Sequence, residues 1–260
     1  MKRVLVIVPF PMNDEEVSRR KTQLDSVRLG ADIAFDFRPV RLGPSSYTSQ
    51  HDFTLADFSI LDAGIDAETD GYDAVCIDTM SDSGMSALRS ILNIPVIGPG
   101  RHAMLTALML GERFSVLVMW DRWKPLYTKT LGELGLRDKC ASIRSIGVQP
   151  DNRKLLAGKE DDVFPKLLEA AQRCIDEDGA DVIILGSTTM HQAHAYLAER
   201  LTVPVINPGP LSYRLAETAL KLNLVHSRST YPSPLVEKKD MIRAIGAAGA
   251  AAAATAGQGA

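Results

Sequence analysis

Two stretches of this chain repeat one another, and the repeat limits the folds open to it more than any other feature of the sequence. Residues 71–84 read Gly-Tyr-Asp-Ala-Val-Cys-Ile-Asp-Thr-Met-Ser-Asp-Ser-Gly, and residues 179–190 read Gly-Ala-Asp-Val-Ile-Ile-Leu-Gly-Ser-Thr-Thr-Met. Each copy is an apolar, β-branched run, typical of a buried parallel strand, and ends in small polar residues before a helical pattern begins. Thr79 and Ser187 therefore occupy equivalent strand ends.

The repeat continues downstream. Residues 93–100, Asn-Ile-Pro-Val-Ile-Gly-Pro-Gly, match residues 202–209, Thr-Val-Pro-Val-Ile-Asn-Pro-Gly. The offset between the copies is 108 residues at Thr79 and 109 at Pro95, so the copies run in step. Strand and helix patterns alternate with short loops, which predicts parallel sheets covered on both faces. The sequence therefore predicts an α/β protein of two pseudo-symmetric, flavodoxin-like lobes with an active site in the cleft between them.

The chain length of 260 residues is sufficient for two such lobes. We expect residues 1–110 to form the first lobe, completed by a C-terminal helix within residues 210–240, and residues 111–209 to form the second. Residues 241–260 are rich in Ala and Gly. From Gly246 onward they have nothing amphipathic to bury, so we expect a frayed tail, or residues foreign to the natural protein, without a function.

Charge and apolar patterning exclude several classes of protein. The formal net charge of −3 gives no basic footprint for nucleic acid, and no stretch approaches the roughly 18 apolar residues that cross a bilayer. Pro9 breaks the apolar N-terminus, which has no small-residue cleavage site, so we expect a cytoplasmic protein that begins with a strand. Three cysteines do not suggest a disulfide scaffold. The run 98–100, Gly-Pro-Gly, lacks the spacing of a nucleotide-binding loop, and we expect no cofactor.

The duplicated plan, the two strand endings and the motifs Ile-Pro-Val-Ile-Gly and Val-Pro-Val-Ile-Asn resemble the aspartate/glutamate/hydantoin racemase superfamily from about Arg3 to Pro234. The resemblance implies a cofactor-independent isomerase in which each half ends its key strand in a cysteine, and the two thiols flank the substrate carbon as acid and base. Those positions fall on Thr79 and Ser187. Because a hydroxyl titrates far above a thiol and needs a neighbouring base, the two-thiol route does not carry over directly to this chain.

Anion binding survives the loss of the thiols. The expected donors are the backbone N–H groups that follow the two hydroxyls, those of Met80, Ser81, Thr188 and Thr189. We expect these groups to open helix N-termini, which favour a carboxylate or an oxyanion, with the hydroxyls of Thr79 and Ser187 donating to the same oxygens. Such a site fits a small carboxylate or cyclic amide with an enolate-like intermediate. The alternative, that these residues only cap helices, explains each residue singly but explains their occurrence in both copies less well.

A proton that moves at carbon needs a carrier other than a thiol. Asp82 occupies a family motif position but could equally cap a helix, and His191 titrates near neutrality but could be a polar surface residue. Strand alternation turns Asp78 away from the site, so we expect a structural role for it. His194 shares a helix face with His191, but no carboxylate follows at metal-ligand spacing, and we expect no metal site.

Further candidates follow other strands. Asn13 matches the family's first-loop substrate contact or caps the next helix, and Trp120 and Tyr127 either wall the pocket or pack in the core. The segment 43–52 is either a lid or a surface connection. Arg122, which follows the same strand as Trp120, could wall the pocket or pair with an anionic substrate. Weaker candidates are Arg101, His102 and His226.

Three classes of function remain open from the sequence. A cofactor-independent isomerase with racemase-like chemistry is favoured because the resemblance is strong. A lyase, decarboxylase or hydrolase that uses Ser and Thr hydroxyls needs only one proton donor, which suits the missing thiols, and a non-catalytic binder of a small carboxylate is the third class. Each implies a small-molecule partner, and the resemblance is compatible with a homo-oligomer whose size the sequence does not fix.

Overall fold

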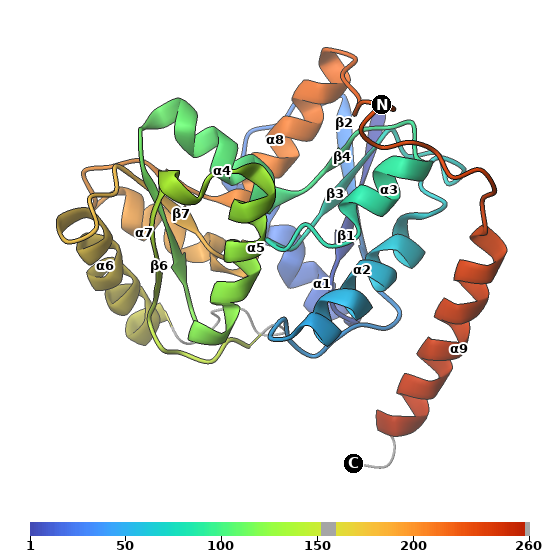
Figure 1. The fold of residues 1–260 in the computed structure, drawn as a ribbon, viewed down its shortest axis with the longest axis horizontal. Coiled ribbons are helices and arrows are strands. Elements are labelled where there is room, and N and C mark those ends of the chain that lie inside the picture. The colour runs from blue at the N-terminus through green and yellow to red at the C-terminus, as the bar shows by residue number, and fades with distance from the viewer. Residues whose placement is uncertain (152–159, 258–260) are drawn as a thin grey trace.

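Two parallel sheets organise the computed structural model, which describes residues 1–151 and 160–257 (Figure 1). The first sheet has the strand order β2-β1-β3-β4 and the second the order β6-β5-β7-β8. Their strands are β1 (Lys2–Val8), β2 (Ile33–Pro39), β3 (Ala74–Ile77), β4 (Val96–Ile97), β5 (Phe114–Val118), β6 (Cys140–Ser145), β7 (Val182–Leu185) and β8 (Val205–Ile206). The repeated segments therefore form equivalent strands, β3 with β7 and β4 with β8, in the first four positions of a flavodoxin-like order. The predicted two-lobed α/β class is confirmed.

Helices connect these strands in the alternating pattern that the sequence predicts. They are α1 (Asp14–Lys21), α2 (Gln50–Gly64), α3 (Met85–Ile91), α4 (Pro99–Leu110), α5 (Lys124–Leu134), α6 (Glu160–Asp176), α7 (His194–Ala198), α8 (Pro208–Lys221) and α9 (Lys239–Gly257). Short 3-10 turns are η1 (Thr22–Ser26), η2 (Asp121–Trp123), η3 (Arg137–Lys139) and η4 (Thr188–Ala193). Within the described ranges, no helix has the length and apolar character needed to span a membrane.

Both faces of the first sheet are covered. On one face, Leu5 and Ile7 of β1 pack with Ile60 of α2 and Leu88 of α3. On the other face, Val4, Val6 and Cys76 pack with Tyr213 and Ala216 of α8. Since β1 and β3 are buried on both sides, their near-continuous apolar sequences are what a central parallel strand requires.

Two helices cross between the lobes. α4 follows the last strand of the first sheet but contacts β5 and β7 of the second sheet, and Met104 belongs to the core of the second lobe. α8 follows the last strand of the second sheet but contacts β3 and β4 of the first. α4 and α8 also contact each other. Because α4 and α8 each pack on the sheet of the other lobe, they join the two lobes. The exact residues at which one lobe ends stay a prediction.

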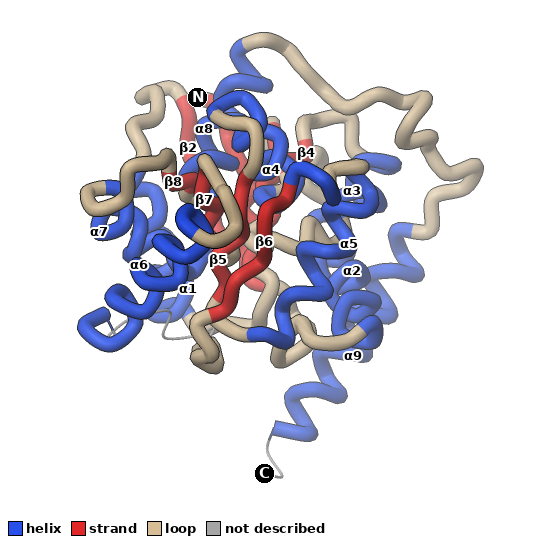
Figure 2. The backbone as a smooth tube through the Cα atoms, turned by 60° about the vertical axis from the view of Figure 1, so that its left-hand side comes forward, coloured by secondary structure: helices blue, strands red, loops and turns tan. Residues whose placement is uncertain are grey.

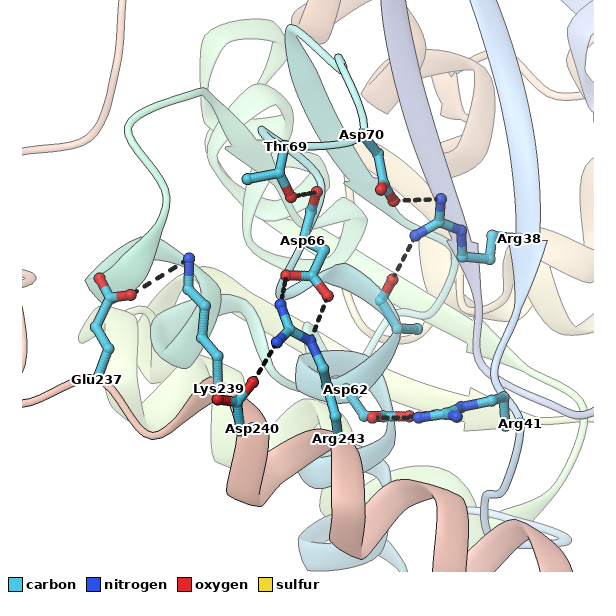
Figure 3. A network of polar contacts seen from close by, with 11 residues as sticks. Arg38, Arg41, Asp62, Asp66, Thr69, Asp70, Glu237, Lys239, Asp240 and Arg243 are labelled. Carbon is cyan, nitrogen blue, oxygen red and sulfur yellow. Dashed lines mark hydrogen bonds and ion pairs between the residues drawn. The ribbon is translucent and has the colours of Figure 1, made fainter.

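The Ala- and Gly-rich C-terminus forms α9, so the prediction of a frayed tail is wrong for residues 246–257. Arg243 pairs with Asp66 at the end of α2 and with Asp240 one turn earlier in α9 (Figure 3). A Cβ atom at Gly246 would lie only 2.4 Å from the Asp62 carboxylate, so the missing side chain lets α9 approach α2. A Cβ atom at Gly249 would also meet Leu42, and beyond Gly249 α9 extends away from the rest of the molecule (Figure 2). Small residues therefore allow α9 to lie close to α2. A search for an amphipathic pattern in the sequence does not detect this kind of contact.

Candidate active site

Matching turns follow β3 and β7. The carbonyl of Thr79 accepts a hydrogen bond from the N–H of Asp82 at 3.1 Å, and the carbonyl of Ser187 accepts one from Met190 at the same distance. In a turn closed this way, the N–H groups of the two central residues take no part in the closing bond. The expected donors of Met80, Ser81, Thr188 and Thr189 hold these central positions. The second turn opens η4 as predicted, but in the first half α3 begins only at Met85, so Met80 and Ser81 do not open a helix.

The Thr79 and Ser187 hydroxyls each lie within a small hydroxyl cluster. Thr79 Oγ1 lies 3.2 Å from Ser81 Oγ, which lies 2.8 Å from Ser83 Oγ. Ser187 Oγ lies 2.8 Å from Thr189 Oγ1 and accepts the N–H of Thr189 at 3.2 Å. The two clusters occupy equivalent strand ends in the two lobes.

Both turns face one pocket between the lobes. The predicted residues that line it are Thr79, Met80, Tyr127, Ser187, Thr188 and Thr189. Apolar walls come from Phe10, Tyr47, Trp123 and Leu126. The free space is about 30 Å³, well below the roughly 300–1,000 Å³ of a usual ligand pocket. Some wall residues must therefore move before a substrate can enter.

Tyr47 brings the segment 43–52 into this site. Its ring is buried and lies edge-on to Phe10 at 5.6 Å between centroids. Its hydroxyl is buried without a hydrogen-bond partner, and burial raises the pKa of Tyr47 well above its usual value. The segment thus covers the pocket, as a lid would, although its movement stays a prediction. Tyr127 closes the opposite side, where its hydroxyl donates to the carbonyl of Gly186 just before Ser187.

Two predicted site residues cap helices in the structure. Asn13 is exposed and forms a capping box with Glu16 at the start of α1, with both hydrogen bonds at 2.9 Å. The Asp82 carboxylate accepts the N–H groups of Gly100 and Arg101 at 2.8 and 2.6 Å, at the start of α4. Burial raises the pKa of Asp82 to about 6 despite these donors. Neither side chain lines the pocket, but Asp82 and Ser81 share an adjacent cavity.

His191 and Trp120 also lie outside the pocket lining. His191 is buried in η4, and its Nε2 makes no hydrogen bond. Burial, aided by the positive charge of Arg20, lowers the pKa of His191 to about 4, so the ring is neutral at pH 7. Trp120 is half-buried and stacks with the Arg122 guanidinium, 5.3 Å from the ring centroid.

A buried ion pair of the first lobe lines the pocket and contacts the second lobe through Thr188. Arg20 Nη1 lies 3.0 Å from the Asp78 carboxylate and 3.2 Å from Thr188 Oγ1, and both charged side chains are 1% exposed. Thr188 Oγ1 donates to the backbone carbonyl of Asp78, and the side chain of Gln23 donates to the Asp78 carboxylate. Asp78 lines the pocket, so the expectation that strand alternation turns it away from the site is wrong. Because Asp78 precedes Thr79 and Thr188 follows Ser187, these contacts couple the two strand ends.

Sequence reasoning missed Arg20, Gln23 and Tyr47. Arg20 belongs to a strongly charged segment that reads as a solvated helix face. One available signal was its position three residues after Val17, on the buried face of α1. No cluster of three or more His, Cys, Asp or Glu side chains that could hold a metal ion occurs in the part of the chain that the structure describes.

The fold and the pocket define a two-lobed α/β protein with a ligand site between its lobes. The chain belongs to the Asp/Glu/hydantoin racemase family, because the family model described as Asp/Glu/Hydantoin racemase matches residues 19–216. A hydantoin racemase of Pseudomonas sp. (strain NS671) is 30% identical over 208 residues, which cover 79% of this chain and 81% of the relative. A hydantoin racemase of Paenarthrobacter aurescens is 28% identical and covers 89% of this chain and 97% of its own.

Solved structures agree with this assignment. Allantoin racemase from Klebsiella pneumoniae matches with a TM-score of 0.82 at 25% identity, covering 91% of this chain and 95% of that one. Allantoin racemase from Pseudomonas fluorescens gives 0.80 at 28% identity, covering 91% and 98%. Arylmalonate decarboxylase, with a TM-score of 0.57 at 20% identity over 82% and 90%, shares the fold alone. The family resemblance seen in the sequence is therefore confirmed.

Proposed function

We propose that this protein is a cofactor-independent, racemase-like isomerase that acts on a small cyclic amide. The observation that carries the proposal is the pair of hydroxyls, Thr79 and Ser187, which come from equivalent strand ends and border one pocket. Removal of a proton next to a ring carbonyl creates an enolate-like oxyanion. Hydroxyl and backbone N–H donors in a pocket with little water stabilise such a charge. The similarity to hydantoin and allantoin racemases supports the same substrate class.

Charge favours a cyclic amide over a dicarboxylate. Arg20 and Asp78 are the charged side chains among the described residues that line the pocket, and they neutralise each other. A doubly negative substrate would find no net positive charge there to offset its desolvation. The aromatic walls of Phe10, Tyr47 and Trp123 instead suit a flat, neutral ring whose carbonyls accept hydrogen bonds.

Proton transfer has an available route on one side of the pocket. The hydroxyl of Thr79 contacts that of Ser81, and Ser81 borders the adjacent cavity with Asp82 and Asp57. Asp82, with a pKa raised to about 6, titrates in the range suited to a general base. We therefore assign Asp82 as the base and Thr79 and Ser81 as the hydroxyls that lead toward it. No hydrogen bond joins Ser81 to Asp82 among the described residues, so the relay needs a water molecule in the cavity that both line. His191 is assigned a structural role because its ring is buried outside the pocket.

The test follows enantiopure allantoin and an enantiopure 5-substituted hydantoin by chiral chromatography. We expect the wild-type protein to interconvert the enantiomers of one of them. Ser187→Ala should slow this by roughly 10²-fold or more, as the loss of one donor to a developing oxyanion does elsewhere. Ser90→Ala is the matched control, because Ser90 bonds only within α3. Full activity of both Ser187→Ala and Thr79→Val would contradict the proposal.

A lyase or decarboxylase on the same scaffold is the second candidate. The asymmetry of the hydroxyl clusters favours it, since the Thr79 cluster includes Ser81, which borders a cavity lined by Asp57 and Asp82, whereas Ser187 contacts Thr189. One proton donor is enough for a reaction that ends in a single protonation. Net formation of a new compound, rather than of the mirror image, would identify this class.

A further inference from the structure

A second cavity, of about 400 Å³, lies apart from the pocket at Thr79 and Ser187. Its floor is β4, and its walls are α8 and the loop that follows α8, with His102 of α4 at one end. None of the described residues that line it also lines the first pocket. Its volume falls within the range of small-molecule sites.

The greater part of this cavity is apolar. Ile97 and Leu215 form its inner surface, and Leu224 and Val225, both more than half exposed, form its rim. Exposed aliphatic side chains around a concave site are a recurrent sign of a ligand that carries an apolar body.

Polar groups converge at the end near Tyr231. The Tyr231 hydroxyl accepts hydrogen bonds from Arg89 at 2.9 Å and from Arg101 at 3.4 Å. Because both partners are donors, the phenolic proton remains available for a ligand. His226 lies edge-on to the Tyr231 ring, with 5.7 Å between centroids, and both of its ring nitrogens are buried near the backbone of Arg89 and Leu92.

Arginines gather at this end, although the buried carboxylate of Asp82 offsets part of the charge of Arg101 and Arg89. Arg89 lines the cavity, Arg101 contacts Tyr231, and Arg228 is anchored beside them on the carbonyl of Arg89. No Asp or Glu occurs among the described residues of the lining. Burial and these arginines lower the pKa of both His102 and His226, which agrees with a site that disfavours further positive charge.

We propose that this cavity binds a small organic anion with an apolar body, its charged group at the Tyr231 hydroxyl and its body against Ile97 and Leu215. The anion would accept the free proton of Tyr231 and offset the charge of the arginines that contact this hydroxyl. The neighbouring helices α4 and α8 join the two lobes, so a bound anion would rest on the elements that hold the molecule together.

Benzoate is a suitable probe, and benzamide is its neutral counterpart of nearly the same shape. Calorimetry on the full-length protein should give binding of benzoate at least tenfold tighter than that of benzamide. Leu224→Glu places a negative charge at the rim and should weaken benzoate binding by about tenfold, as a charge a few ångströms away does in a largely aqueous setting. Leu224→Gln introduces a side chain of the same size as Glu but without the charge, and it should leave the preference for benzoate intact.

Several results would overturn the proposal. The first is that benzoate does not bind at millimolar concentration, and the second is that benzamide binds with the same affinity as benzoate. The third is that Leu224→Glu and Leu224→Gln bind benzoate with the same affinity. If Ser187→Ala abolishes benzoate binding and Leu224→Glu leaves it unchanged, benzoate binds in the first pocket. That result would equally contradict the proposal. The experiment does not use turnover, so its outcome is independent of the proposed isomerase activity.

Discussion

Thr79 and Ser187 place hydroxyls where the family resemblance implies thiols. This difference determines which reactions the site can catalyse. A thiol ionises near pH 8.5 and can take a proton itself, whereas a hydroxyl mainly donates hydrogen bonds. The structure keeps both hydroxyls at equivalent strand ends beside one pocket. We therefore expect stabilisation of an oxyanion, with a relay for the proton, in place of direct thiol chemistry.

Restoring the thiols tests this reading. The double variant Thr79→Cys with Ser187→Cys should exchange the substrate's C–H proton at least tenfold faster than the wild-type protein, because each face then gains a group that can ionise near neutrality. Loss of the ring C–H signal of a hydantoin or of allantoin, followed by NMR in deuterium oxide, measures this rate, and each single variant is a control. A folded double variant without any gain would show that the two positions do not flank the reacting carbon.

His191 predicts a pH dependence of stability. Its pKa is about 4 in the folded protein and close to 6.5 when unfolded, so between these values the unfolded chain binds the proton. The free energy of unfolding should therefore fall as the pH drops from 6.5 to 4, by up to about 3 kcal/mol. For His191→Gln, the free energy of unfolding measured by urea denaturation should not show this part of the pH dependence. His51→Gln, at an exposed position, should keep it.

Sequence reasoning at the residue scale succeeded where position along a strand decides the outcome. Thr79, Ser187 and their successors were found because two copies of one pattern mark the same strand end. Arg20 and Tyr47 were missed because each reaches the pocket through tertiary packing, which a charged helix and a polar loop do not encode locally. For Asp82, the capping alternative matches its hydrogen bonds to α4.

At the scale of elements, strands were predicted more accurately than helix ends. The sequence pattern of residues 15–29 predicts one helix, but α1 ends at Lys21 and continues as the 3-10 turn η1, which brings Gln23 to Asp78. The pattern of residues 190–200 also predicts a helix, but this segment begins within η4, because Ser187 caps the turn that starts at Thr188. Both departures lie beside the pocket, where tertiary contacts override helix propensity.

α9 gives a matched pair of predictions. Replacing a helical glycine by alanine gains about 1 kcal/mol of helix propensity. At Gly249 the new Cβ meets Leu42 at 3.3 Å, which a flexible side chain can accommodate, so Gly249→Ala should protect α9 further. At Gly246 it meets Asp62, which Arg41 holds in place, so Gly246→Ala should destabilise the packing of α9 by roughly 1–3 kcal/mol. Hydrogen exchange over residues 239–257 distinguishes them, and equal protection would refute the close contact.

At the scale of the whole molecule, the exchange of α4 and α8 predicts that the lobes unfold together. Both tryptophans, Trp120 and Trp123, follow β5 in the second lobe, so their fluorescence reports that lobe, whereas far-ultraviolet circular dichroism reports both. The two signals should share one denaturation midpoint, because neither sheet keeps its covering helix if the other lobe unfolds. Separate midpoints would mean that the crossed helices do not couple the lobes.

The central claim is that the pocket between the lobes labilises a C–H bond next to a ring carbonyl. Proton NMR in deuterium oxide, with hydantoins, allantoin, amino acids, malonates and diacids as candidates, tests it most directly. The account predicts loss of the ring C–H signal of a cyclic amide without net conversion, at a rate that Thr79→Val combined with Ser187→Ala reduces at least 100-fold. Deuterium entering none of these compounds, or conversion of a malonate to a new product, would contradict it.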